Sequence, residues 1–222
     1  MRSDAAALSV GALQEKLELD IVLGHLRPRE RLVEDELMAR FAAKRHIVRS
    51  VLAELERLGL VERRPNKGAM VRDYSIAEVE EIYAFRADLH QIAIDRMDLP
   101  LDDDVATNLS DLADRHEAAI AQNNLTEVIL CNNAFHDTLF DQCGNRFLAE
   151  TIRQLGWTSH AIRSYRVGDP SLLRQAAEEH RAIIAAAASG DRKQLAELVD
   201  RHIQPSKNMY LSDRLRQSGP LL

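Results

Sequence analysis

The chain has 222 residues, of which 45% are apolar, and a formal net charge of −6. That is enough to bury a core in one domain or two. Its two cysteines, Cys131 and Cys143, form no metal-binding pair, nothing at the N-terminus resembles a signal peptide, and no apolar run approaches the roughly 20 residues that cross a bilayer. We therefore expect a soluble protein of the reducing cytoplasm with no membrane partner.

Three apolar stripes with helical spacing follow one another in the first 60 residues. The first recurs every four residues at Leu13, Leu17 and Ile21. The third keeps an uninterrupted three-and-four spacing from Val48 to Leu58, and Gly59 ends it. The expected elements are a helix over residues 11–23, a connector around Pro28, a short helix with Val33, Leu37 and Phe41, and a third helix that ends at Gly59.

Positive charge is concentrated around the third helix. Residues 40–72 hold nine Lys or Arg against three acids, whereas residues 73–222 hold 15 basic and 24 acidic side chains. The local surplus suits a polyanion, and the acidic remainder should repel one.

Two short helices joined by a tight link, the second with cations on its outer face, form a helix-turn-helix that enters the major groove. Arg45 and Arg49 lie four residues apart near the start of that second helix, where they are candidates to read bases. The alternative is a solvated basic face on a core-packing helix. Residues 60–64 and 69–72 are strand-like and flank residues 65–68, which predicts a hairpin wing with a basic tip.

The run GHLRPRERLVEDELMARFAAKRHIVRSVLAELERLGLVERRPNKGAMV resembles the winged-helix domain of the GntR family of bacterial transcription regulators, over about residues 11–72. In that family the two helix arginines and the glycine-tipped wing contact the operator. The resemblance thus implies DNA roles for Arg45, Arg49, Lys67 and Gly68. Our full set of candidate DNA-binding residues is Arg31, Lys44, Arg45, His46, Arg49, Lys67 and Gly68.

The turn before the third helix departs from the family pattern. Ala42, Lys44, His46 and Ile47 stand where relatives usually have Gly, Ser, Thr and Pro. The turn glycine and the N-cap hydroxyl are therefore missing, and a lost Ser or Thr cap costs about 1 kcal/mol. Lys44 is a candidate for an added phosphate contact, and the operator need not be the family's usual sequence.

The second half is helical throughout, with no strand pattern. Ser75 is a plausible cap for a helix over residues 76–97, and Pro100 follows its end. The fold class is therefore mainly α, with a winged helix-turn-helix over residues 1–73, an all-α effector and dimerisation domain over 74–213, and a disordered tail over 214–222. Further helices are expected over residues 102–122, 125–143, 145–166, 171–189 and 191–212, which makes six in the bundle.

Asn132 and His136 share one helix face, and His180 and His202 fall on two other expected helices. Facing helices of a bundle can converge such side chains on zinc, nickel, manganese or a similar divalent ion. From the residues alone, surface histidines or satisfied core histidines explain them as well, because long spacings carry no specificity.

Residues 79–203 resemble the FCD effector domain of the FadR branch of GntR regulators, in its six-helix, VanR-like form. The resemblance implies that Asn132, His136, His180 and His202 bind a metal that holds an organic acid. Asn132 is a neutral ligand where many relatives have Asp, which affects affinity and metal choice.

A carboxylate effector also needs cations. Arg86 matches an arginine of the family's first effector-domain helix, and His90 stands where relatives often have Glu. The further candidates lie on a later helix and are Arg153, Trp157, His160 and Tyr165. A solvated arginine and ordinary aromatic packing explain these four residues equally well.

These features predict a ligand-responsive repressor, a homodimer that binds double-stranded operator DNA and senses a small organic acid through a metal, and not an enzyme. A metal-dependent hydrolytic enzyme is the first alternative, and Glu178-Glu179-His180 is its only candidate cluster, which a solvated helix face explains as well. The other alternative is an interaction module that binds nucleic acid without sequence preference, in which case binding would be salt-sensitive and uniform.

Overall fold

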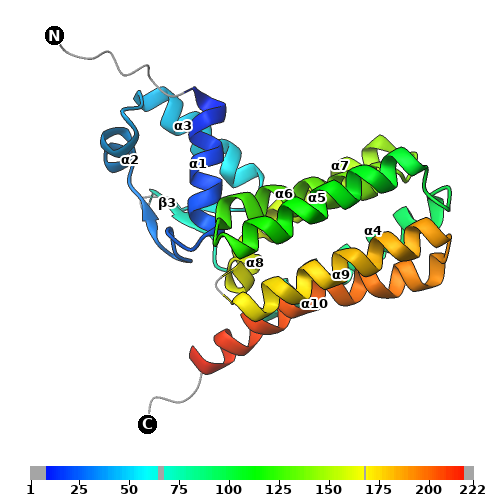
Figure 1. The fold of residues 1–222 in the computed structure, drawn as a ribbon. Coiled ribbons are helices and arrows are strands. Elements are labelled where there is room, and N and C mark those ends of the chain that lie inside the picture. The colour runs from blue at the N-terminus through cyan, green and yellow to red at the C-terminus, as the bar shows by residue number, and fades with distance from the viewer. Residues whose placement is uncertain (1–8, 65–67, 168, 218–222) are drawn as a thin grey trace. The chain divides into compact units, whose positions relative to one another are not determined.

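The computed structural model describes residues 9–64, 68–167 and 169–217, which group into two compact units. The first unit comprises the chain up to Tyr74 together with Trp157–Ser164. The second comprises Ser75–Gly156 together with the chain from Tyr165 onwards. Helices dominate both units, and the strands lie in the first (Figure 1).

The first unit is a winged helix. Its three helices follow the three apolar stripes of the sequence, and Leu13, Leu17 and Ile21 of the first stripe are buried. The elements are α1 (Val10–Val22), β1 (Arg31–Leu32), α2 (Glu34–Phe41), α3 (Arg45–Arg57), β2 (Val61–Arg64) and β3 (Gly68–Val71).

The sheet has three antiparallel strands in the order β1-β3-β2, one more than the expected hairpin. Arg31 pairs with Met70, and Val61 pairs with Val71. The sequence predicted only a connector where β1 lies, because two residues are too few to show the alternation that marks a strand. Residues 65–67 at the predicted wing tip, Lys67 among them, lie outside the described residues.

Helix α3 packs one side into the core of this unit and carries basic residues on the other. Val48, Val51, Leu52 and Leu55 are buried along one side, so the opposite side is left to the cations. Gly59 ends the helix with a φ of +77°, and the Tyr74 hydroxyl donates a hydrogen bond of 2.6 Å to its carbonyl oxygen. A β-carbon at Gly59 would lie 2.8 Å from that hydroxyl.

The turn between α2 and α3 shows both departures noted in the sequence. Ala42 adopts a left-handed conformation with a φ of +49°, in which an L side chain is strained. Lys44 is the N-cap of α3, and no side-chain hydrogen bond caps the helix.

We expect Ala42→Gly to raise the free energy of unfolding of the winged-helix unit by about 1 kcal/mol, because glycine adopts positive φ without strain. Differential scanning calorimetry measures the change. Ala43→Gly is the matched control, since Ala43 is buried and is not among the positive-φ residues. Glycine there should destabilise instead, and equal shifts for both variants would contradict the strain at Ala42.

The second unit is a helical bundle in which α5 packs against α6 and α9, while α10 packs against α4 and α9. Ser75 and Glu78 form a reciprocal capping box at the start of α4, as the sequence suggested for Ser75. An apolar core that includes Leu109, Phe135 and Ile183 joins the helices. The helices after the winged helix are α4 (Ile76–Arg96), α5 (Asp103–Ala121), α6 (Leu125–Asp141), α7 (Arg146–Thr158), α8 (His160–Val167), α9 (Pro170–Ser189) and α10 (Arg192–Gln217).

Two boundaries correct the sequence-based expectations. The single helix expected over residues 145–166 is divided into α7 and α8 at Ser159, whose carbonyl oxygen accepts the backbone N–H of Ile162 and Arg163. The weak helix formers Gly156, Thr158 and Ser159 favour this break. At the other end, residues 214–217 of the expected disordered tail are helical, since α10 continues to Gln217. In the described part of the chain, no helix combines the length and the apolarity that spanning a membrane requires.

Candidate metal centre and DNA-binding face

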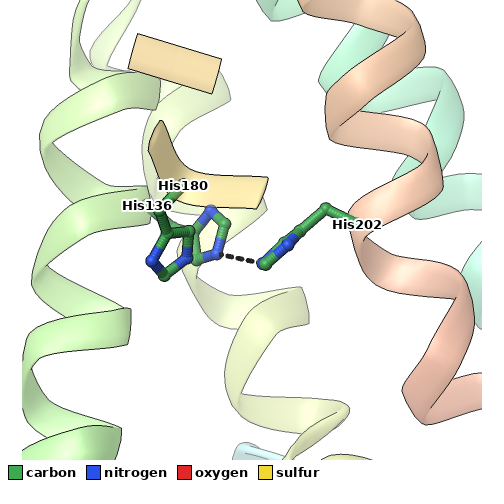
Figure 2. A group of neighbouring side chains, drawn as sticks. All are labelled: His136, His180 and His202. Carbon is green, nitrogen blue, oxygen red and sulfur yellow. Dashed lines mark hydrogen bonds between the residues drawn. The ribbon is translucent and has the colours of Figure 1, made fainter. Parts of the chain in front are cut away.

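Three histidines from three helices converge inside the bundle. His136 lies on α6, His180 on α9 and His202 on α10, and their ligand atoms lie within 4.8 Å of one another. Figure 2 shows the rings turned toward one another. His180 and His202 are buried and His136 is half-buried.

One pair of these nitrogens has the spacing of two ligands on a divalent ion. Two nitrogens that bind one ion at about 2.0–2.1 Å lie roughly 2.8–3.4 Å apart at angles between octahedral and tetrahedral. The Nε2 atoms of His136 and His202 are 3.2 Å apart. Three neutral imidazoles suit zinc, nickel or manganese, and they leave coordination positions for another ligand.

Glu179 holds the ring of His202. Its Oε2 atom lies 2.7 Å from His202 Nδ1, and its Oε1 atom accepts a hydrogen bond of 2.8 Å from the Gln175 amide. A carboxylate accepts, so Nδ1 carries the proton and Nε2 presents its lone pair to the other histidines. The solvated-face interpretation of this cluster holds for Glu178, which is exposed, but it is wrong for the buried Glu179.

Two further side chains adjoin His180. The ring of His116, on α5, lies 4.9 Å from the His180 ring, and the ring of Phe135 stacks on it at 4.1 Å. Sequence reasoning missed His116. A signal for it existed, since His116 shares the buried stripe of α5 with Leu109, Leu112 and Ala113.

Asn132 lies one turn before His136 on α6 and is half-buried. Its amide nitrogen lies 3.5 Å from Asn133 Oδ1. Its role as a ligand stays a prediction.

Arg86 and His90 bring polar groups into the bundle from α4. Both side chains are buried, Arg86 lies over the ring of Tyr83, and His90 stacks on Phe140. Burial, together with the positive charge of Arg86, holds the pKa of His90 well below its usual value, so this histidine is neutral. His90 Nδ1 is buried and has no hydrogen-bond partner among the described residues.

The other predicted effector residues are divided between the two units, with Arg153 in the second and Trp157 and His160 in the first. Arg153 is paired with three carboxylates, at 3.2 Å from Asp137, 3.1 Å from Asp141 and 2.7 Å from Glu150. Trp157 and His160 group with the first unit, and their rings lie 4.5 Å apart. The side chain of Tyr165 lies outside the described residues. An effector role for these four residues stays a prediction.

The predicted DNA-binding residues that the structure describes share one property, which is exposure. Lys44, Arg45, His46 and Arg49 are exposed at the start of α3. Arg31 on β1 and Gly68 at the start of β3 are exposed as well. The exposed cations of α3 therefore stand opposite its buried apolar side, as a groove-binding helix requires.

Two family models match the chain. The description "Bacterial regulatory proteins, gntR family" matches residues 10–71, and the FCD domain matches residues 81–205, more than half of the chain. The chain belongs to the GntR family, with an FCD domain. It is a DNA-binding transcriptional regulator and not an enzyme.

Relatives of this GntR regulator agree with the family. It is 28% identical to the HTH-type transcriptional regulator YdhC of Bacillus subtilis over 169 residues, 76% of this chain and 75% of that protein. It is also 28% identical to the Nta operon transcriptional regulator of Aminobacter aminovorans over 181 residues, 81% and 84% of the two chains. The transcriptional repressor RspR of Escherichia coli is 23% identical over 201 residues, 90% of this chain and 86% of RspR.

Solved structures share the fold of the GntR regulator. McbR/YncC of E. coli superposes with a TM-score of 0.76 at 18% identity, over 92% of this chain and 98% of that one. A GntR transcriptional regulator from Rhodococcus sp. RHA1 superposes with a TM-score of 0.75 at 20% identity, over 91% and 97% of the two chains. These likenesses show the arrangement of a winged helix followed by a helical bundle.

Proposed function

We propose that this GntR regulator is a repressor that senses a small organic acid through a divalent ion held by His136, His180 and His202. The observation that carries the proposal is the convergence of three imidazoles within 4.8 Å inside the FCD domain. The ion supplies a Lewis-acidic position for a carboxylate oxygen. The role of the protein is to hold that ion and to orient the acid.

Arg86 and His90 support a carboxylate as the ligand. A guanidinium pairs with a carboxylate through charge-assisted hydrogen bonds, and burial strengthens that attraction. The buried Nδ1 of His90 offers one more contact, because a neutral imidazole can donate from that atom. An apolar ligand would leave the buried Nδ1 of His90 without a hydrogen bond, so we favour an acid.

The DNA side of the proposal is a homodimer on a two-fold operator. Arg45 and Arg49 would read bases, while Arg31, Lys44, His46, Lys67 and Gly68 would position the protein on the backbone. Repression is supported by the name of the relative RspR, which is called a repressor. A protein that binds operator DNA works in the cytoplasm.

A metal analysis and a native mass spectrum of the purified protein test the effector side. We expect about one divalent ion per chain and a co-purifying small acid. A protein that retains no ion, and takes up none when zinc, nickel or manganese is added, would contradict the proposal.

Glu179→Gln should weaken ion binding by about 10- to 100-fold, because Glu179 fixes the tautomer and the orientation of His202. Competition with a chromogenic chelator measures the affinity. Glu178→Gln, the exposed neighbour, removes the same charge and should leave the affinity unchanged. Equal affinities for the two variants would show that Glu179 does not support the site.

A further inference from the structure

The first turn of α2 places two carboxylates against the two candidate base-reading arginines. Asp35 Oδ1 lies 2.7 Å from Arg45 Nη2. Glu34 lies between both arginines, at 3.5 Å from Arg45 Nη1 and 2.9 Å from Arg49 Nε. In the absence of DNA, the basic face of α3 is therefore partly neutralised by its own helix-turn-helix.

The carboxylates contact the guanidinium groups of Arg45 and Arg49 at different edges. Glu34 contacts Arg49 at Nε, which lies 3.0 Å and 2.9 Å from its two oxygens. Such a contact leaves the Nη1–Nη2 edge of the guanidinium for a guanine, which takes two parallel N–H donors. The contacts of Arg45 are made at Nη1 and Nη2, the same edge that a base would need.

The side chains of Asp35 and Glu34 also differ in exposure. The Asp35 side chain is 73% exposed and that of Glu34 is 31% exposed. Exposed ion pairs contribute little and are screened by salt, so phosphates can displace Asp35. The less exposed Glu34, which bonds through both oxygens, is better placed to persist on DNA.

We propose that these carboxylates act in opposite directions on DNA recognition. Glu34 is a positioning residue that stays paired with Arg49 and aims its outer edge at a base. Asp35 masks Arg45 and is displaced when the protein binds DNA, which restrains binding to DNA of any sequence. This inference rests on the proposed roles of Arg45 and Arg49 in reading the operator.

The test uses the full-length protein and a duplex that wild-type protein selects from a randomised pool, with a scrambled duplex of the same length and composition for comparison. Fluorescence anisotropy over a salt series gives both affinities and the salt slope. The variants are Glu34→Ala, Glu34→Gln and Asp35→Asn. Glu36→Gln is the matched control, because Glu36 lies in the same turn and makes no ion pair among the described residues.

Glu34→Ala should weaken binding to the selected duplex by about 3- to 10-fold, the effect of releasing one positioned side chain, and should not weaken binding to the scrambled duplex. Glu34→Gln keeps an acceptor oxygen and should recover part of the discrimination. Asp35→Asn should tighten binding to both duplexes by about 2- to 5-fold and steepen the salt slope, and by more than Glu36→Gln does.

The proposal is overturned if Glu34→Ala and Asp35→Asn change binding to the selected duplex in the same direction, or if Asp35→Asn matches Glu36→Gln. If circular dichroism shows that Glu34→Ala is unfolded, Glu34→Met replaces it, since it keeps the length without an acceptor. Arg49→Ala distinguishes a failure of the base-reading role of Arg49 from a failure of the positioning role of Glu34. If Arg49→Ala leaves discrimination intact, the base-reading role itself is wrong. If Arg49→Ala loses discrimination and Glu34→Ala does not, only the positioning role of Glu34 fails.

Discussion

His180→Ala should reduce the ion content of the purified protein from about one per chain to none. His180 is fully buried, its ring lies 5.4 Å from that of His136 and 4.9 Å from that of His202, and the remaining pair cannot replace its nitrogen. Even loss of a supporting group can weaken such sites by about 10- to 100-fold, so loss of a ligand should weaken them further. Mass spectrometry of metals measures the content directly.

Thermal unfolding provides a second measurement for His180→Ala. An ion at roughly 100 times its dissociation constant stabilises the native state by about 2.7 kcal/mol, and the variant should gain none of this. His116→Ala is the control, because His116 is equally buried and contacts the His180 ring but is not among the three convergent ligands. A His180→Ala protein that keeps the ion, or a His116→Ala protein that loses it, would contradict the assigned ligands.

Arg49→Ala should weaken binding to the selected duplex by about 1–3 kcal/mol and relax discrimination at one base position. The loss comes from a bidentate contact to guanine, which no other side chain at the start of α3 duplicates in our account. Repeating the selection with the variant protein identifies the relaxed position.

Arg57→Ala is the matched control for Arg49→Ala. Arg57 is an exposed arginine at the end of the same helix, and it is paired with Glu54. Its removal should reduce affinity slightly and equally on selected and scrambled DNA, as loss of a distant charge does. If Arg49→Ala also lost the same affinity on both duplexes, Arg49 would be a phosphate contact.

The fold could be predicted from the sequence wherever long apolar stripes alternate with turn signals. The buried stripes of α1 and α3 and the cap at Ser75 are read directly from residue spacing. Strand β1 could not be predicted in this way, because its two residues pair with β3 through backbone atoms. The break at Ser159 was missed because the apolar periodicity continues across it.

The site was less predictable from the sequence. His180 and His202 lie 44 and 66 positions after His136, and such long spacings carry no geometric information until the bundle is formed. The family resemblance supplied the three histidines. A solvated helix face explains Glu179 as well as a catalytic role does when charge is considered, but Glu179 lies three residues after Ala176 and four before Ile183 on the buried stripe of α9. The pairing of Asp35 with Arg45 depends on the angle between two helices, and sequence spacing does not encode that angle.

The central claim is that a metal-held acid in the bundle changes operator binding. The most direct measurement is the affinity for the selected duplex, determined with a panel of mono-, di- and tricarboxylic acids on metal-loaded and on chelated protein. We predict that at least one acid that stabilises the metal-loaded protein changes its DNA affinity, and that the change disappears on chelation, because an effector acts only through its different affinities for two states. DNA affinity that stays constant with every acid that stabilises the protein would contradict the account.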